Sequence, residues 1–114
     1  MATIYKICTR AEWLKAERQG QFLGSAVDVR DGFIHFSTAA QTVETAAKHF
    51  AGIADLMLIA VDAETLGAAL KWERSRNDDL FPHLYAVLPL HAVRWAKPLP
   101  DAVDGRRVFP ELAP

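Results

Sequence analysis

The run from Leu56 to Val61 is the longest purely apolar segment of this chain, and Asp55 and Asp62 border it. It is far shorter than the roughly 18 residues that a membrane-spanning helix needs. A short run that is apolar on both faces is instead typical of a buried β-strand. We therefore predict a strand over residues 55–61 that is covered on both sides.

The length of 114 residues predicts one domain over residues 1–114. We expect the core over about residues 3–99, and a surface tail over residues 100–114, which show no periodicity. The apolar fraction of 51% and the charged fraction of 24% are ordinary for a soluble globular protein. The net charge is -1 and the basic residues are scattered. This argues against nucleic acid as a partner, because phosphate binding needs a concentrated basic face.

The cysteine content and the N-terminus indicate the compartment. Cys8 is the one cysteine, so no intrachain disulfide can form. It lies in an apolar-rich segment, where a buried and inert thiol is expected. The first residues lack the apolar segment of a secretory signal. We therefore expect a cytoplasmic protein with no membrane association, and its oligomeric state stays open.

A capping box at Thr9 predicts the first main helix. Glu12 stands three residues after the threonine, so its carboxylate can accept from the Thr9 amide while the threonine oxygen accepts from the third helical amide. The helix is expected over about residues 10–18, with Gly20 as its stop. Ala11 and Leu14 are expected on one face of this helix, with Trp13 at the edge of that face.

A second capping box, Thr38 to Gln41, predicts the other main helix. Apolar residues at i, i+3, i+4 and i+7 predict its buried stripe. These residues are Val43, Ala46, Ala47 and Phe50. Gly52 is predicted to end the helix.

The remaining elements define the fold class. Residues 22–32 are expected to be irregular, with Ser25 capping a single turn and Asp31-Gly32 forming a tight turn. The order strand, helix, strand, helix and then mostly strands favours an α+β fold over a doubly wound one. We predict a mixed, mostly antiparallel split sheet with two main helices. Further strands are expected over residues 3–8, 33–36, 70–73, 84–88 and 93–97, the last with Val93 and Trp95 on one side.

The segment from Phe33 to Thr38 carries the first candidate site residues. His35 lies in the middle of a short apolar strand, where it could orient a ligand or could be a buried histidine that bonds a loop carbonyl. Ser37 and Thr38 open a helix, where free amides and the helix dipole favour an anion. One of the two hydroxyls is expected to cap the helix, and the other is the candidate for ligand binding.

A second segment, Leu80 to Tyr85, also places a histidine beside aromatic residues. His83 and Tyr85 are expected to share a strand face, where they could line a pocket or simply form a strand edge. Glu73 is the carboxylate best placed for chemistry, because it follows apolar residues and precedes a polar loop. Its alternative role is an ordinary strand-end ion pair with a nearby arginine.

No metal site is expected. The four histidines do not show the close spacing of zinc ligands, and there is no cysteine pair. The sequence also lacks the glycine-rich dinucleotide and phosphate loops and the nucleophile-elbow motif. The sequence therefore contains none of these motifs to identify a ligand.

Three segments in order give the chain a resemblance to the domain-of-unknown-function 952 family, which consists of small bacterial proteins with some plant relatives. The matching residues are Gly32–Thr38, Trp72-Glu73 and Leu80–Tyr85, followed by Leu88–Leu90. The resemblance extends from Ile4 to about Leu99. It implies the fold of the ADP-ribosyltransferases, which bind NAD in the cleft of a split, mostly antiparallel sheet.

The resemblance also implies a partial set of equivalent residues. Phe36-Ser37-Thr38 resembles the strand end that shapes the nicotinamide pocket in those enzymes. The first strand offers Tyr5 and Lys6 where the enzymes place an arginine or histidine. The strand expected at residues 84–88 has no glutamate where the enzymes place the catalytic one, and Glu73 is the nearest candidate.

These observations predict a pocket for a nucleotide-like or phosphate-bearing small molecule, with NAD as the candidate cofactor. The function implied is an NAD-related transferase, that is, an ADP-ribosyltransferase-like glycosyltransferase with an incomplete catalytic motif. The alternative is a non-catalytic binding or interaction module, and a hydrolase or phosphotransferase acting on a nucleotide phosphate is a third class. The candidate catalytic residues are Glu73 and His35, and the candidate cofactor-binding residues are Ser37, Thr38, His83 and Tyr85.

Overall fold

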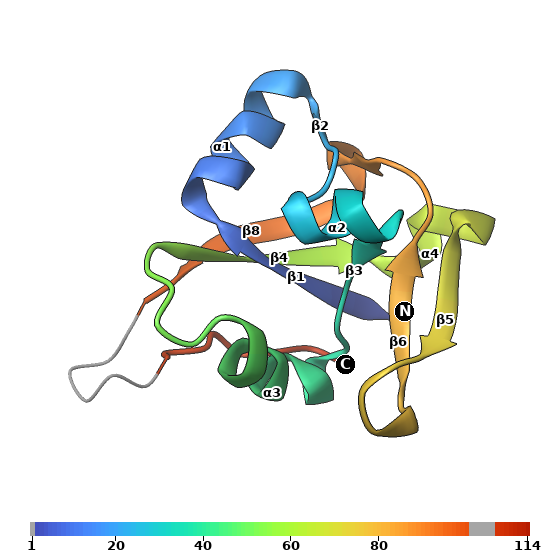
Figure 1. Cartoon of the computed structure of the whole chain (residues 1–114). Coiled ribbons are helices and arrows are strands. Elements are labelled where there is room, and N and C mark those ends of the chain that lie inside the picture. The colour runs from blue at the N-terminus through green and yellow to red at the C-terminus, as the bar shows by residue number, and fades with distance from the viewer. Residues whose placement is uncertain (1, 101–106) are drawn as a thin grey trace.

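The computed structural model describes residues 2–100 and 107–114, and its strands form three antiparallel sheets (Figure 1). The first sheet has the order β1-β4-β8, the second is the pair β2-β7, and the third has the order β3-β6-β5. The α+β class and the antiparallel pairing agree with the prediction. The strands are β1 (Thr3–Thr9), β2 (Gln21–Phe22), β3 (Ile34–His35), β4 (Leu56–Asp62), β5 (Leu70–Arg74), β6 (Leu80–Leu84), β7 (Leu88–Pro89) and β8 (Val93–Leu99).

The apolar strand β4 is the central strand of the first sheet, between β1 and β8. Its side chains alternate between two separate clusters of buried apolar residues, one on each face of the sheet. One cluster takes Met57, Ile59 and Val61. The other takes the alternate residues of β4, beginning with Leu56. The prediction of a strand buried on both faces is confirmed.

A short backbone link joins the first sheet to the third. Ser37, just after β3, exchanges two backbone hydrogen bonds with Tyr5 of β1, with N···O distances of 2.8 and 2.9 Å. The amide of Phe36 donates to the carbonyl of Pro82 in β6 at 3.0 Å. The segment from His35 to Ser37 therefore passes from the third sheet to the first. It contacts β6 at His35 and β1 at Ser37.

Both predicted capping boxes are present. Thr9 caps α1 (Arg10–Gln19), which ends at Gly20 in the left-handed conformation with a φ of 80°. Thr38 caps α3 (Ala39–His49), which ends before Gly52. These two helices are the longest among the described residues.

The predicted apolar faces agree with the buried residues only in part. In α1 the buried residues are Trp13 and Ala16, and Leu14 is 44% exposed. In α3 Ala46 of the predicted stripe is buried, whereas Val43 is exposed. The other buried residue of α3 is Thr42, whose hydroxyl donates to the Thr38 carbonyl at 2.7 Å. A hydroxyl that bonds within its own helix carries no apolar signal, so the periodicity did not select Thr42.

Two stretches differ from the predicted elements. Residues 22–32 contain α2 (Ala26–Asp31), and Gly32 is its left-handed end rather than part of a tight turn. Strand β6 begins at Leu80 and ends at Leu84, whereas a strand over 84–88 was expected. The expected strand began after Pro82, but Pro82 lies inside β6. It pairs with Trp72 of β5, and its carbonyl accepts from the Phe36 amide.

The last strand and the tail complete the fold. Ala60 of β4 pairs with Trp95 of β8, and the next residue, Val61, pairs with Val93. Strand β8 therefore contains one extra residue at this point, which is a bulge. Val93 and Trp95 therefore pack against different clusters, which corrects the prediction that they share a side. Part of the predicted tail, residues 101–106, lies outside the described residues, and Phe109 beyond it packs against the second cluster.

The remaining helical segments are short. They are α4 (Ala63–Leu66), η1 (Gly67–Ala69), η2 (Arg76–Asp78) and η3 (Leu90–Ala92). Within the described part of the chain, no helix has the length and apolar character to cross a membrane.

The burial of Cys8 in β1 predicts that its thiol is unreactive in the folded protein. Burial is the main cause that raises the pKa of its thiol to about 12, so almost no reactive thiolate exists at pH 8. We expect no reaction of the folded protein with Ellman's reagent over the time in which the urea-unfolded protein reacts completely. Equal rates in the two states would contradict the buried position.

Candidate functional site

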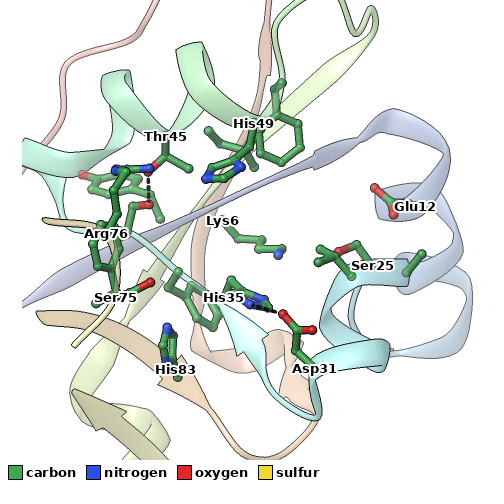
Figure 2. Close-up of a pocket in the computed structure, with 18 of the residues that line it drawn as sticks. Lys6, Glu12, Ser25, Asp31, His35, Thr45, His49, Ser75, Arg76 and His83 are labelled. Atoms are coloured by element: carbon green, nitrogen blue, oxygen red, sulfur yellow. Dashed lines mark hydrogen bonds and ion pairs between the residues drawn. The ribbon is translucent and has the colours of Figure 1, made fainter. Parts of the chain in front are cut away.

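A cavity of about 560 Å³ lies between α2, α3, β1 and the histidine-bearing strands β3 and β6. This volume is within the range of about 300–1,000 Å³ that is typical of small-molecule pockets. Figure 2 shows Arg76 and Ser75 toward one end and Ser25 and Glu12 toward the other. Lys6 and His35 lie between these two ends (Figure 2).

The two histidines of the site are cross-strand neighbours. His35 of β3 pairs with His83 of β6, and the centres of their rings are 5.6 Å apart. Phe33 contacts both imidazoles, with ring-centre distances of 4.5 Å to His35 and 4.2 Å to His83. Both histidines line the cavity. The pocket therefore has two imidazoles on one wall, held by an aromatic side chain.

Asp28 of α2 fixes the position of His35. One of its oxygens, Oδ1, accepts from the His35 amide at 3.1 Å and lies 2.7 Å from the His35 Nδ1. Lys6 of β1 places its Nζ 3.0 Å from Oδ1 and 2.8 Å from Oδ2, and the Ser25 amide donates to Oδ2 at 2.9 Å. The Asp28 and Lys6 side chains are 1% and 5% exposed, so this ion pair is buried.

The surroundings of Asp28 keep it ionised. Burial alone would raise its pKa, but the hydrogen bond with His35 and the charge of Lys6 outweigh burial and lower the pKa well below the ordinary 3.8. The carboxylate thus acts as an acceptor at both oxygens. It connects the start of α2, strand β1 and strand β3 at a single point.

The second nitrogen of His35 also faces a carboxylate. Its Nε2 lies 3.0 Å from Oδ2 of Asp31, whose other oxygen bonds Arg30 at 3.0 Å. A carboxylate can only accept, so the ring donates to both acids only when it is doubly protonated. The hydrogen bond from Arg30 is the main cause that lowers the pKa of Asp31. His35 is therefore held in place at both nitrogens.

His83 has a different environment. Its Nδ1 lies 2.8 Å from Oε1 of Glu73, and the Tyr85 hydroxyl donates to the same oxygen at 2.7 Å. The hydrogen bonds from Tyr85 and His83 lower the pKa of Glu73. The hydrogen bond with Glu73 is also the main cause that raises the pKa of Tyr85. The His83 side chain is 7% exposed, whereas that of Glu73 is 39% exposed.

Arg76 provides a positive charge at one end of the cavity. Its Nε lies 3.0 Å from Glu44, its Nη2 donates to the Thr45 hydroxyl at 3.1 Å, and its guanidinium lies 5.0 Å from the centre of the Phe81 ring. Ser37 contacts the same Thr45 hydroxyl at 3.0 Å. These contacts hold the arginine against the cavity wall with its side chain only 16% exposed.

The structure brings together three of the six predicted site residues at the cavity. His35, Ser37 and His83 line it. Thr38 lies outside the lining, and its hydroxyl accepts from the Gln41 amide as a helix cap. Glu73 and Tyr85 are also outside the lining, and they reach the cavity only through His83.

Three contributors to the site were missed from the sequence. Lys6, Asp28 and Arg76 were not assigned to it, although Lys6 was noted in the first strand. A signal existed for Asp28, because Ser25 followed by an acidic residue three positions later is a capping pattern. A lysine inside an apolar strand also implies a buried counter-charge. Arg76 gave no such signal, because it is one of several charged residues in a polar loop.

The arrangement does not offer a metal centre. Within residues 2–100 and 107–114, no group of three or more His, Cys, Asp or Glu side chains is placed to hold a metal ion. The acids near the histidines are occupied by hydrogen bonds and ion pairs. The side chains that line the cavity can bind a ligand by charge and hydrogen bonds, and an imidazole there can transfer a proton.

The comparisons with known proteins agree with the predicted resemblance. A family model described as a protein of unknown function, DUF952, matches residues 7–96. The chain belongs to the DUF952 family. Among curated proteins no match was found.

Solved structures of one family relative share this fold. The crystal structure of protein CC0527 from Caulobacter crescentus is 53% identical, with 93% of each chain covered and a TM-score of 0.88. Its solution NMR structure is 54% identical, with 93% of this chain and 91% of that chain covered and a TM-score of 0.82. The family and the fold are thus established, and the site has to be interpreted from its own geometry.

The buried ion pair predicts a stability effect. Replacing Asp28 with Asn leaves the Lys6 charge buried without its partner, and should lower the free energy of unfolding at pH 7 by about 3–5 kcal/mol. Because the folded pKa of Asp28 is lowered, its stabilising effect is present above pH 3.8 and is lost as the pH falls below it. The difference in the free energy of unfolding between wild type and Asp28→Asn should therefore be smaller in denaturant titrations at pH 3 than at pH 7.

Asp31→Asn is the matched control. Asp31 belongs to the same helix and contacts the same histidine, but it forms a surface pair with Arg30. We expect a change within about 1 kcal/mol for this variant. Equal losses for the two variants would contradict the central role of Asp28.

Proposed function

We propose that the cavity binds a nucleotide-like, phosphate-bearing small molecule. The observation that carries this proposal is the convergence of the Arg76 guanidinium and the imidazoles of His35 and His83 on one cavity of about 560 Å³. Arginine is the side chain best suited to phosphate, because its planar fork can donate two parallel hydrogen bonds. The remaining wall includes aromatic and apolar side chains, among them Phe36, Phe50 and Phe81.

The two ends of the cavity suit different parts of such a ligand. A phosphate fits the end with Arg76 and the hydroxyl of Ser75 (Figure 2). The opposite end carries the carboxylates of Asp31 and Glu12, which accept hydrogen bonds. Hydroxyl and amide donors, such as those of a ribose or a base, are suited to that end.

An NAD-related transferase is the more specific form of the proposal. It rests on the resemblance of Phe36-Ser37-Thr38 to the nicotinamide-pocket strand of ADP-ribosyltransferases and on the proposed likeness to their fold. Ser37 joins the two sheets and lines the cavity, which supports a pocket at this position. NAD is accordingly the first cofactor to test, and the catalytic roles of this form were assigned from the sequence to His35 and Glu73.

Two observations favour a second candidate, a binding module without transferase chemistry. Glu73 bonds His83 and Tyr85 and does not line the described cavity, so it is not placed to stabilise charge on a ligand directly. Lys6 occupies the first strand where the enzymes carry an arginine or histidine, and Asp28 already binds it. Both facts are compatible with ligand binding alone.

Calorimetric titration with NAD, ADP-ribose and inorganic phosphate tests the proposal. We expect at least one phosphate-bearing compound to bind, and Arg76→Gln to weaken that binding about tenfold or more, because a charge-assisted hydrogen bond is lost. Product analysis of the NAD sample by mass spectrometry separates the transferase from the binding module.

Arg94→Gln is the control for the loss of one positive charge. Arg94 lies on β8, interacts with Asp62 at 3.5 Å and does not line the cavity. Its replacement should leave the binding constant within about twofold of wild type, because an exposed charge outside the cavity is screened by salt. No binding of any of the three compounds, or equal weakening by both variants, would contradict the proposed pocket.

A further inference from the structure

We propose that His83 is the proton acceptor of this pocket and that Glu73 is its positioning residue. The inference rests on the proposed ligand site and adds a chemical role to it. It changes the assignments made from the sequence, in which Glu73 was the catalytic group and His83 a binding residue. The ligand class it requires is a phosphate-bearing molecule that also carries a hydroxyl group, such as a ribose.

The contact with Glu73 determines which nitrogen of His83 carries the proton. An ionised carboxylate only accepts hydrogen bonds, so the 2.8 Å contact requires a hydrogen on Nδ1. In the neutral ring the other nitrogen, Nε2, then has a free lone pair. The lowered pKa of Glu73 is consistent with its being ionised in this contact.

The free nitrogen faces the cavity. Nε2 of His83 has no hydrogen-bond partner among the described residues, and none of their buried side-chain nitrogen or oxygen atoms lacks a partner. Nε2 is therefore accessible to solvent, and His83 lines the described cavity. Figure 2 shows the ring of His83 directed into this space from β6.

The neighbouring histidine cannot take the same role in this arrangement. Both nitrogens of His35 face carboxylates, at 2.7 Å from Asp28 and 3.0 Å from Asp31. It therefore has no nitrogen left for a ligand. His83 differs in having one carboxylate partner and one nitrogen toward the cavity, which is the arrangement that orients a general base.

The proposed step is a single proton transfer. A hydroxyl group of the bound ligand, or a water beside it, gives its proton to Nε2 of His83. The O–H bond breaks, its electron pair stays on the oxygen, and a new N–H bond forms. The resulting imidazolium is stabilised by the negative charge of Glu73, which remains hydrogen-bonded at Nδ1. Tyr85 donates to the same oxygen and so holds the carboxylate in place.

Nuclear magnetic resonance of histidine labelled with ¹⁵N tests this directly. Long-range correlations at pH 8 report which ring nitrogen carries the proton. We expect the Nδ1–H form of His83 to dominate by about tenfold or more in the wild-type protein, because it alone can donate to the carboxylate. Glu73→Ala should remove this preference. Tyr85→Phe, the matched control, removes the other donor to the same oxygen and should keep it.

Addition of ADP-ribose then tests contact with the ligand. We expect the Nε2 resonance of His83 to shift until the site is saturated. A dominant Nε2–H form, no effect of Glu73→Ala, or an unchanged Nε2 resonance while calorimetry shows binding would overturn the inference and leave the binding proposal intact. If ADP-ribose does not bind but NAD does, the same measurement is made with NAD, and absence of binding by NAD, ADP-ribose and inorganic phosphate would overturn both proposals.

Discussion

The buried carboxylate of Asp28 is the contact on which the pocket depends. It binds the Lys6 ammonium from β1, the backbone and ring of His35 in β3, and the Ser25 amide at the start of α2. Lys6 lies 22 residues from Asp28 in the sequence, whereas α2 and β3 follow each other along the chain (Figure 1). A buried charge is tolerated only when it is paired and hydrogen-bonded, so the three segments must meet in one geometry.

The fold follows from simpler constraints. Strand β4 is apolar on both faces and separates two clusters of core residues, and β1 and β8 flank it. The exchange of hydrogen bonds between Tyr5 and Ser37 joins this sheet to the one that contains β6. The pocket therefore lies where two sheets meet, and polar groups there can be held by rigid strands without interrupting either apolar cluster.

Local patterns in the sequence were enough to predict much of this fold. The run from Leu56 to Val61 predicted the central strand, and the capping boxes at Thr9 and Thr38 predicted both long helices. The buried face of α3 was predicted only in part, because Thr42 is buried through a hydrogen bond within its own helix. The bulge in β8 depends on pairing with a distant strand, so alternation along the chain placed Val93 incorrectly.

The site was less accessible to sequence reasoning. The two histidine-bearing segments were expected to lie together, and the structure makes them cross-strand partners. Whether a ring nitrogen is free for a ligand depends on the contacts with Asp28, Asp31 and Glu73, and these contacts span seven, four and ten residues. Such contacts form only when the elements pack, so the sequence showed candidate residues and the structure distinguishes their roles.

The carbon-13 resonance of the Asp28 carboxyl group, followed from pH 7 downward in the folded wild-type protein, tests the central claim most directly. The account predicts that this carboxyl group stays ionised well below pH 3.8, until the protein unfolds, because His35 and Lys6 lower its pKa. Protonation of Asp28 at its ordinary pKa, with the fold intact and His35 unmoved, would contradict it.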